Sequence, residues 1–281
     1  MPLLGAHMSI AGSVGQAVYR GQQVGCQVVQ IFTKQPNRWA ARPLAAEEIA
    51  AFQRAREETG IATVFAHDAY LINLASPDAV LWEQSVDSFQ MEVERAAALQ
   101  LPFLVTHAGA HRGSGEEAGL QRIVEALDRV CERTPQAGVT ILLETTAGQG
   151  GYLCYRFEHL AWIIAQARCP ERLGVCFDTC HVFAAGYELR TPAAYAETMQ
   201  RFDQIVGLDR IRAFHLNDCL KGLGSRVDRH THIGQGQLGL EAFRSLLNDP
   251  RFGDRPMVLE TPKGPEMEED RQNLAVLRGL M

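Results

Sequence analysis

The sequence lacks the features that would direct the chain into a membrane, along an export route or into an oxidising compartment. Its first residues show no basic segment, apolar stretch or small-residue cleavage site, so we expect no signal peptide. No apolar run approaches the roughly 20 residues of a membrane-spanning helix. The seven cysteines are an odd number without a pairing pattern, which favours reduced thiols over a disulfide framework. We therefore expect a cytoplasmic protein that does not bind a membrane.

Excess positive charge is lacking as well. The formal net charge is −6, which argues against a coat of basic residues for binding nucleic acid. A local basic or metal-rich cleft is still compatible with this charge, because the field depends on distribution and bound cations contribute to it. Hydrophobic residues make up 46% of the 281 residues, enough for a sizeable core. The composition leaves the partner open.

A convincing glycine-rich phosphate-binding turn is lacking after the first apolar run, which argues against an open doubly wound sheet. Short apolar runs instead alternate with helix-like segments eight times, the layout of a (β/α)8 TIM barrel. We expect one domain over residues 1–281, with the active site at the C-terminal face of the strands. The expected strands are residues 3–8, 28–34, 63–67, 103–107, 140–145, 173–178, 211–216 and 256–261. The expected helices include residues 45–60, 84–100, 119–134, 157–167, 193–207 and 240–249.

Ionisable side chains lie at the C-terminal ends of these expected strands, where barrel enzymes carry their catalytic residues. A single histidine there is more often hydrogen-bonded packing than a ligand. Seven ionisable groups around one barrel mouth, however, need a compensating partner, and a divalent metal ion is the natural one. These seven are His7, His67, His107, Glu144, Asp178, His215 and Glu260.

The stretch GVCFDTCHVFAAGY, residues 174–187, permits two interpretations. Cys176, Cys180 and His181 could form a thiolate zinc site, or the end of the strand could be an active-site wall with bystander cysteines. Side chains alternate along a strand, so if Asp178 points into the barrel mouth then Cys176 points inward one layer deeper. Cys176 is then a small core residue, which weakens the thiolate interpretation.

Imidazole and carboxylate ligands suit catalytic zinc, manganese or iron, and no cysteine pair has the spacing of a structural zinc site. Asp228 and His230 stand two residues apart in the loop after the seventh strand, so they can bind one ion together with His181. These candidate ligands are more than one ion needs, so we expect two or three ions that share a carboxylate such as Glu144. Neighbouring divalent ions activate water and neutralise phosphate oxygens, which indicates phosphoester hydrolysis.

Several stretches of the chain resemble the endonuclease IV family of apurinic/apyrimidinic (AP) endonucleases. The resemblance runs from Gly5 to the C-terminal NLAVLRGL, and FDTCHxFAAGYxLRTP and GSRVDRH are its most specific parts. The stretches are GAHMSIAG, HDAYLINLASP, ETTAGQG, GVCFDTCHVFAAGYELRTP, FHLND, GSRVDRHTHIGQG and LETPKG.

This resemblance implies a centre of three Zn²⁺ ions, with Mn²⁺ as a substitute, that serves base excision repair. The enzyme would cut duplex DNA on the 5′ side of an abasic site, leaving a 3′-hydroxyl and a 5′-deoxyribose phosphate, and could also clean blocked 3′ ends. Glu144 and Glu260 are the expected catalytic residues. Matched by motif, His67, His107 and Glu144 hold one ion, Glu144, Asp178, His215 and Glu260 a second, and His181, Asp228 and His230 a third.

The resemblance also implies side chains that enter the DNA at the lesion while the abasic nucleotide turns out of the helix. Tyr70 and Leu71 match the wedge residues, an aromatic and an apolar side chain that can fill the gap. The chain has Asn37 where the family often has an inserting arginine, which makes the adjacent Arg38 the candidate for that role. It also has Thr145 where asparagine is common. Phosphate contacts are expected from Lys34, Arg38, Lys221, Arg226 and Arg229.

Two other functions compete with the endonuclease. A single-metal sugar isomerase or epimerase of similar fold would need only Glu144, Asp178, His215 and Glu260. A non-catalytic DNA-binding barrel would have no use for a full ligand set. The further candidate ligands favour the endonuclease, and metal content separates it from an epimerase with one ion per chain. Nothing in the chain calls for a partner subunit, so we expect a monomer.

Overall fold

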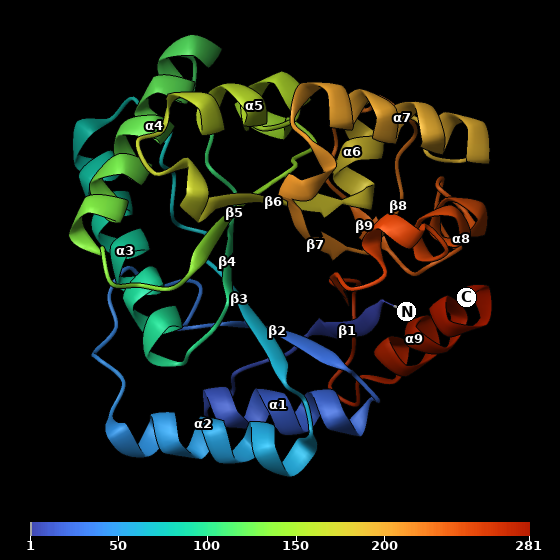
Figure 1. The fold of residues 1–281 in the computed structure, drawn as a ribbon, viewed down its shortest axis with the longest axis horizontal. Coiled ribbons are helices and arrows are strands. Elements are labelled where there is room, and N and C mark those ends of the chain that lie inside the picture. Colours follow the sequence, from blue (N-terminus) through green and yellow to red (C-terminus); the bar gives the residue numbers. More distant parts are fainter. Residues whose placement is uncertain (1) are drawn as a thin grey trace.

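Eight parallel strands close into a barrel in the computed structural model, which describes residues 2–281 (Figure 1). Their order around the barrel is β1-β10-β7-β6-β5-β4-β3-β2, so the predicted TIM barrel is confirmed. All eight begin at the expected residue, and six end one or two residues earlier than expected. The strands are β1 (Leu3–His7), β2 (Val28–Phe32), β3 (Thr63–His67), β4 (Phe103–Thr106), β5 (Thr140–Glu144), β6 (Leu173–Asp178), β7 (Ile211–His215) and β10 (Pro256–Leu259).

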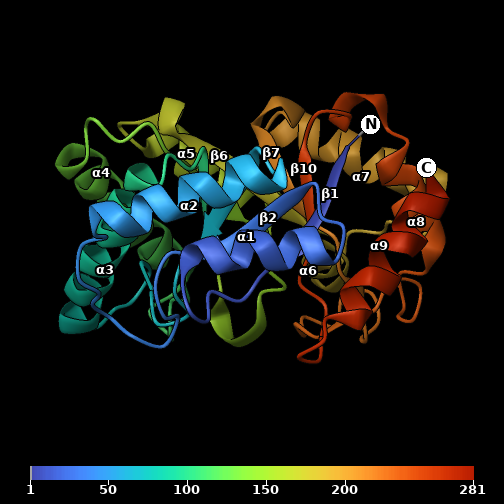
Figure 2. The ribbon, with the colours of Figure 1, turned by 90° about the horizontal axis from the view of Figure 1, so that it is seen from below.

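Helices surround the barrel, and α1 and α2 lie side by side along its outer face (Figures 1 and 2). Ser13, Asp78 and Thr191 accept backbone N–H bonds at the starts of α1, α3 and α7 and so fix where these helices begin. No helix within residues 2–281 is long and apolar enough to cross a membrane. The helices are α1 (Val14–Gln23), α2 (Ala46–Thr59), α3 (Ala79–Ala98), α4 (Glu116–Arg133), α5 (Phe157–Gln166), α6 (Thr179–Ala185), α7 (Pro192–Ile205), α8 (Leu240–Leu247) and α9 (Glu268–Leu280).

An inner core fills the barrel and is separate from the apolar layer between strands and helices. Cys176 belongs to this inner core, as the alternation of side chains along β6 predicted. Strand β1 supplies glycine at the equivalent place, because a Cβ on Gly5 would collide with the carbonyl oxygen of Val28. The inner core consists of Val28, Phe65, Val105, Leu142, Cys176, Ala213 and Val258.

One disulfide joins Cys131 of α4 to Cys169, just before β6, which corrects the expectation that the cysteines are unpaired. The two cysteines are 38 positions apart in the sequence, but their Cα atoms lie 6.6 Å apart in the fold. A disulfide requires this proximity, which the folded chain creates and the spacing of cysteines does not reveal. The other five cysteines are free and buried.

Reduction of the Cys131–Cys169 disulfide is expected to lower the free energy of unfolding by about 2–4 kcal/mol, because the cross-link restricts the unfolded chain. Urea unfolding with and without a thiol reductant measures the difference. In the Cys131→Ser variant the reductant should have no further effect. Equal stability of reduced and oxidised wild-type protein would contradict the prediction.

Candidate metal centre

Each barrel strand brings one inward side chain to the C-terminal mouth of the barrel. Side chains alternate along a strand, so the residue two places after each inner-core position faces the same axis, closer to the mouth. On β1 this position lies two places after Gly5. Seven of the eight are the ionisable residues expected at the strand ends, and the eighth is a glutamine from β2. The eight are His7, Gln30, His67, His107, Glu144, Asp178, His215 and Glu260.

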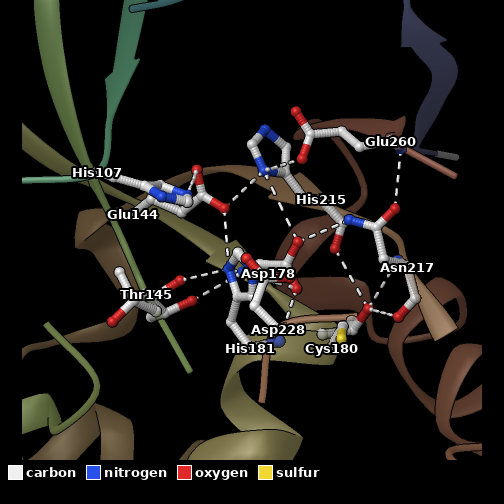
Figure 3. A network of polar contacts seen from close by, with 12 residues as sticks. His107, Glu144, Thr145, Asp178, Cys180, His181, His215, Asn217, Asp228 and Glu260 are labelled. Carbon is white, nitrogen blue, oxygen red and sulfur yellow. Dashed lines mark hydrogen bonds and ion pairs between the residues drawn. The ribbon is translucent and has the colours of Figure 1, made fainter. Parts of the chain in front are cut away.

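Glu144 lies at the centre of this cluster and is fully buried. Its Oε2 atom is 3.1 Å from Nε2 of His67 and 3.2 Å from Nε2 of His107. Its Oε1 atom is 3.0 Å from Nδ1 of His215 and 3.1 Å from Nδ1 of His181 (Figure 3). The two carboxylate oxygens thus face different histidines, the arrangement that a carboxylate shared between two ions requires.

Residues 2–281 contain four groups of potential metal ligands, and within each group the ligand atoms all lie within 4.8 Å of one another. Two of these groups have the composition expected for the first and second ions, and they share Glu144. Their imidazole and carboxylate donors fit Zn²⁺, which binds nitrogen and oxygen ligands in catalytic sites. The groups are His67, His107 and Glu144; Glu144, Asp178, His215 and Glu260; Asp178, His181 and His230; and Cys180, Asp228 and His230.

The end of β6 explains how Asp178 and His181 come together. Asp178 Oδ1 accepts a 2.8 Å hydrogen bond from the backbone N–H of His181, so this carboxylate caps α6, which follows β6 directly. Its Oδ2 accepts a 2.7 Å bond from Nδ2 of Asn217 (Figure 3). His181 Nδ1 lies 2.9 Å from the backbone carbonyl oxygen of Thr145, to which it can donate. This leaves Nε2 of His181 free to face the loop after β7.

That loop carries the remaining candidate ligands, and a short antiparallel pair holds its two ends. Strand β8 (Asp218–Cys219) pairs with β9 (His230–Thr231). His181 Nε2 is 3.2 Å from Oδ2 of Asp228 and 3.2 Å from Nε2 of His230. Asp228 Oδ1 is in turn 3.3 Å from Nε2 of His230. The structure therefore brings the three residues of the third expected ion within contact distance of one another.

The cluster strongly shifts the pKa values of its buried members. Burial lowers the pKa of His67, but its contacts with Asp68 and Glu144 outweigh burial and raise the pKa well above its ordinary value. Burial also lowers the pKa of His181 and of His215, but their neighbours raise both values well above the ordinary one. Asp178, Asp228 and Glu144 raise the pKa of His181. Cys176, Glu144 and Glu260 raise that of His215. Burial raises the pKa of Glu144, whereas the surrounding histidines lower it far more. A divalent ion can replace the imidazole protons in this charge balance, because histidine must be neutral to act as a ligand.

Cys180 lies close enough to Asp228 and His230 to count as a potential ligand. The thiol is buried, however, and its Sγ atom is 3.8 Å from the carbonyl oxygen of Arg229. A hydrogen bond with Cys219 and burial both raise the pKa of the Cys180 thiol. Since a thiolate is the form that binds metal, these surroundings disfavour Cys180 as a ligand.

The Cys180→Ser variant is expected to keep its full metal content and its activity, with a loss of stability of about 1 kcal/mol from a buried substitution. Metal analysis of the purified variant beside wild type is the measurement. Loss of one ion per chain would instead restore the thiolate interpretation of residues 174–187.

Tyr70, predicted as a wedge, lines a cavity at the candidate metal centre, together with His67 and His107. Its side chain is 71% exposed, and its ring packs edge-on against Phe32 at 5.2 Å. Phe32 itself contacts His7 and His67, so the aromatic pair adjoins the cluster. Leu71 is half-buried beside Tyr70. Tyr70 is placed to meet a ligand that enters this cavity.

The three arginines proposed for DNA occupy different surroundings. Arg226 is held in place, with its guanidinium 3.6 Å from the ring centre of Tyr155 and a 3.3 Å hydrogen bond to the Gly148 carbonyl. Arg229 is exposed and lines a neighbouring cavity that also includes Tyr70. Arg38 is exposed but lines a different cavity.

Lys34, expected to contact phosphate, is buried instead. Its Nζ atom lies 3.2 Å from Oε1 of the buried Glu92 on α3 and donates a 2.6 Å hydrogen bond to the Arg38 carbonyl. If the Lys34 amine moved away from Glu92 toward a phosphate, two buried charges would be left unpaired. Lys34 therefore stays in this ion pair, and its bond to the Arg38 carbonyl holds the loop in place. The expectation for Lys34 was therefore wrong.

Sequence reasoning missed the uncharged side chains that orient the cluster. Thr145 was noted only as a departure from a family pattern, yet its Oγ1 accepts a 2.9 Å bond from the Asp178 backbone N–H. Asn217 connects Asp178 to the backbone N–H of Glu260. Gln30 could have been found, because alternation from the inward Val28 points to it directly.

Known proteins resemble this chain in sequence and in fold. The family described as xylose isomerase-like TIM barrel matches residues 18–280. A probable endonuclease 4 of Chloroflexus aggregans is 56% identical over 281 residues, which covers 100% of this chain and 98% of that relative. The crystal structure of endonuclease IV from Thermus thermophilus superposes with a TM-score of 0.87 at 40% identity, covering 99% and 98% of the two chains. D-psicose 3-epimerase from Clostridium cellulolyticum, with a TM-score of 0.72 at 13% identity over 99% of each chain, shares the fold alone.

Proposed function

The chain belongs to the endonuclease IV family, and on this premise we propose that it is a metal-dependent AP endonuclease of DNA repair. The observation that carries the proposal is the extent of the ligand cluster. An epimerase-like site would need the four residues around His215, whereas here His67 and His107 face the second oxygen of Glu144. His181, Asp228 and His230 add a further set beside them.

We propose Zn²⁺ as the resident ion, three per chain, held by the three residue sets expected from the sequence. Such ions, when bound, activate water and neutralise phosphate oxygens in phosphoester hydrolysis. The protein contributes the fixed orientation of its ligands. His67 Nδ1 lies 2.9 Å from the Asp68 carbonyl oxygen and His181 Nδ1 2.9 Å from that of Thr145, so in each ring Nε2 faces the cluster.

The proposed substrate is duplex DNA with an abasic site, cut on the 5′ side of the lesion to leave a 3′-hydroxyl and a 5′-deoxyribose phosphate. A nucleotide without a paired base leaves the helix at low cost, and the exposed Tyr70 ring can fill the resulting gap. Arg226 and Arg229 would contact the phosphates, which makes binding weaker at high salt. Cleaning of blocked 3′ ends would use the same phosphoester chemistry.

Incision of a duplex oligonucleotide with one abasic-site analogue, without added metal, tests the proposal. We expect a single cut 5′ to the lesion that leaves an extendable 3′-hydroxyl and is lost in the Glu260→Gln variant. Added magnesium should not be needed, because the ions would be enclosed by protein ligands. Failure to cut by protein that carries its full set of ions would refute the endonuclease. A content of one ion per chain would favour a sugar isomerase or epimerase.

A further inference from the structure

Strand β2 contributes the one uncharged side chain among the eight at the barrel mouth. Gln30 is fully buried, and β1 pairs with β2 so that His7 lies beside Gln30. The position two residues before it, Val28, belongs to the inner core, so Gln30 points along the same axis as the candidate ligands. A buried amide without hydrogen-bond partners would cost free energy, so we expect the Gln30 amide to have partners inside the barrel.

Both polar atoms of the Gln30 amide make hydrogen-bond contacts within the cluster. Its Oε1 atom is 2.8 Å from Nε2 of His215. Its Nε2 atom donates to Oε1 of Glu260 at 2.5 Å and lies 2.9 Å from Nδ1 of His7. The same glutamine therefore contacts two members of the group formed by Glu144, Asp178, His215 and Glu260.

These contacts determine which nitrogen of His215 is free to bind an ion. An amide oxygen can only accept, so it holds a proton on Nε2 of His215. The lone pair of the neutral ring is then on Nδ1, which faces Glu144 Oε1 at 3.0 Å and Glu260 Oε2 at 3.2 Å. Partners that fix the tautomer and orientation of a ligating histidine strengthen metal binding.

We infer that Gln30 is a positioning residue for one ion of the proposed centre, the ion held by Glu144, Asp178, His215 and Glu260. The inference rests on the proposed metal-dependent function. Gln30 orients His215 from one side and fixes one oxygen of Glu260 from the other, leaving Oε2 of Glu260 directed toward His215 Nδ1.

The effect should be confined to that single ion. His67 and His181 are oriented by the backbone carbonyls of Asp68 and Thr145 and not by Gln30. A change at position 30 therefore leaves the supports of the other two residue sets in place. This selectivity separates positioning from a general structural role, which would weaken all ions together.

The Gln30→Met variant removes the contacts with His215, Glu260 and His7 while keeping an unbranched side chain of similar length. Release of Zn²⁺ from the full chain to a chromophoric chelator should show one ion per chain bound about 10–100-fold more weakly than in wild type. The other ions should be released as in wild type. The slowly exchanging ring N–H signal of His215 in the NMR spectrum of the zinc-loaded protein should disappear.

Gln27→Met is the matched control. Gln27 precedes the same strand and accepts a hydrogen bond from the backbone N–H of Leu4, away from the cluster. Its ion release should equal that of wild type.

Three outcomes would overturn the inference. Identical zinc release from Gln30→Met and wild type, with wild type active on abasic DNA, would refute the role of Gln30 and leave the proposed function standing. Uniform weakening of every ion, with a lower unfolding midpoint, would assign Gln30 a structural role only. A wild-type chain that binds no divalent ion and does not cut would refute both proposals.

Discussion

Exchange of Glu144 for glutamine is expected to abolish incision and to release metal from the centre. The carboxylate is fully buried and each of its oxygens faces histidine nitrogens, two within 3.2 Å of Oε2 and two within 3.1 Å of Oε1. Glutamine has an NH₂ group in place of one carboxylate oxygen, and this group cannot bind an ion. Removing one partner from a buried charged network lowers the stability by about 3–5 kcal/mol. Loss of the shared ligand should lower the incision rate by at least about 100-fold, the upper end of the effect of removing a residue that only supports a ligand.

Ion content and the incision rate, measured on the same preparation of Glu144→Gln, test this expectation. Glu241→Gln is the matched control, because Glu241 undergoes the same chemical change at an exposed position of α8, 3.4 Å from Arg244. The control should behave as wild type in both measurements. If Glu144→Gln kept all ions and cut at the wild-type rate, Glu144 could not be a shared ligand.

The Asp178→Asn variant is expected to lose both metal and stability. Its Oδ1 can still cap α6, because asparagine is a good N-cap residue. The new Nδ2 group, however, would meet the donor Nδ2 of Asn217 where the carboxylate now accepts at 2.7 Å. Turning the Asn217 amide over would break its 2.9 Å bond from the Glu260 backbone N–H. One buried hydrogen bond is thus lost in either case, at about 1–3 kcal/mol.

Urea unfolding, together with metal analysis, measures this double effect. Asp209→Asn, an exposed aspartate in the turn before β7, is the control and should change neither quantity. An Asp178→Asn protein as stable as wild type would show that the hydrogen bond with Asn217 contributes nothing. A full complement of ions in the variant would remove Asp178 from the ligand set.

The barrel could be predicted from the sequence because apolar runs of a parallel barrel stand out between amphipathic helices. All eight strands begin at the expected residue, and the ionisable residues at their ends cluster as expected. Six of the strand ends were placed too late, since polar residues such as Thr261 continue the pattern without pairing. Helix α6 was missed because Asp178, the last residue of β6, is also its N-cap.

Features that depend on partners from distant segments could not be predicted. In the sequence, Lys34 looks like an exposed lysine of a loop. Only the packing of α3 in the folded chain brings the buried Glu92 next to it. The partner of Cys131 lies 38 positions away, without any local signal. Gln30 was missed for a different reason: a search for titratable groups passes over an amide, although the amide has both a donor and an acceptor to offer.

The spacing of two residues between the inner core and the barrel mouth has an evolutionary consequence. On each strand the inner-core position and the position at the barrel mouth are different residues, so selection can act on them separately. A lineage could exchange the mouth residues one strand at a time, and acquire a new reaction, without rebuilding the interior that holds the barrel together.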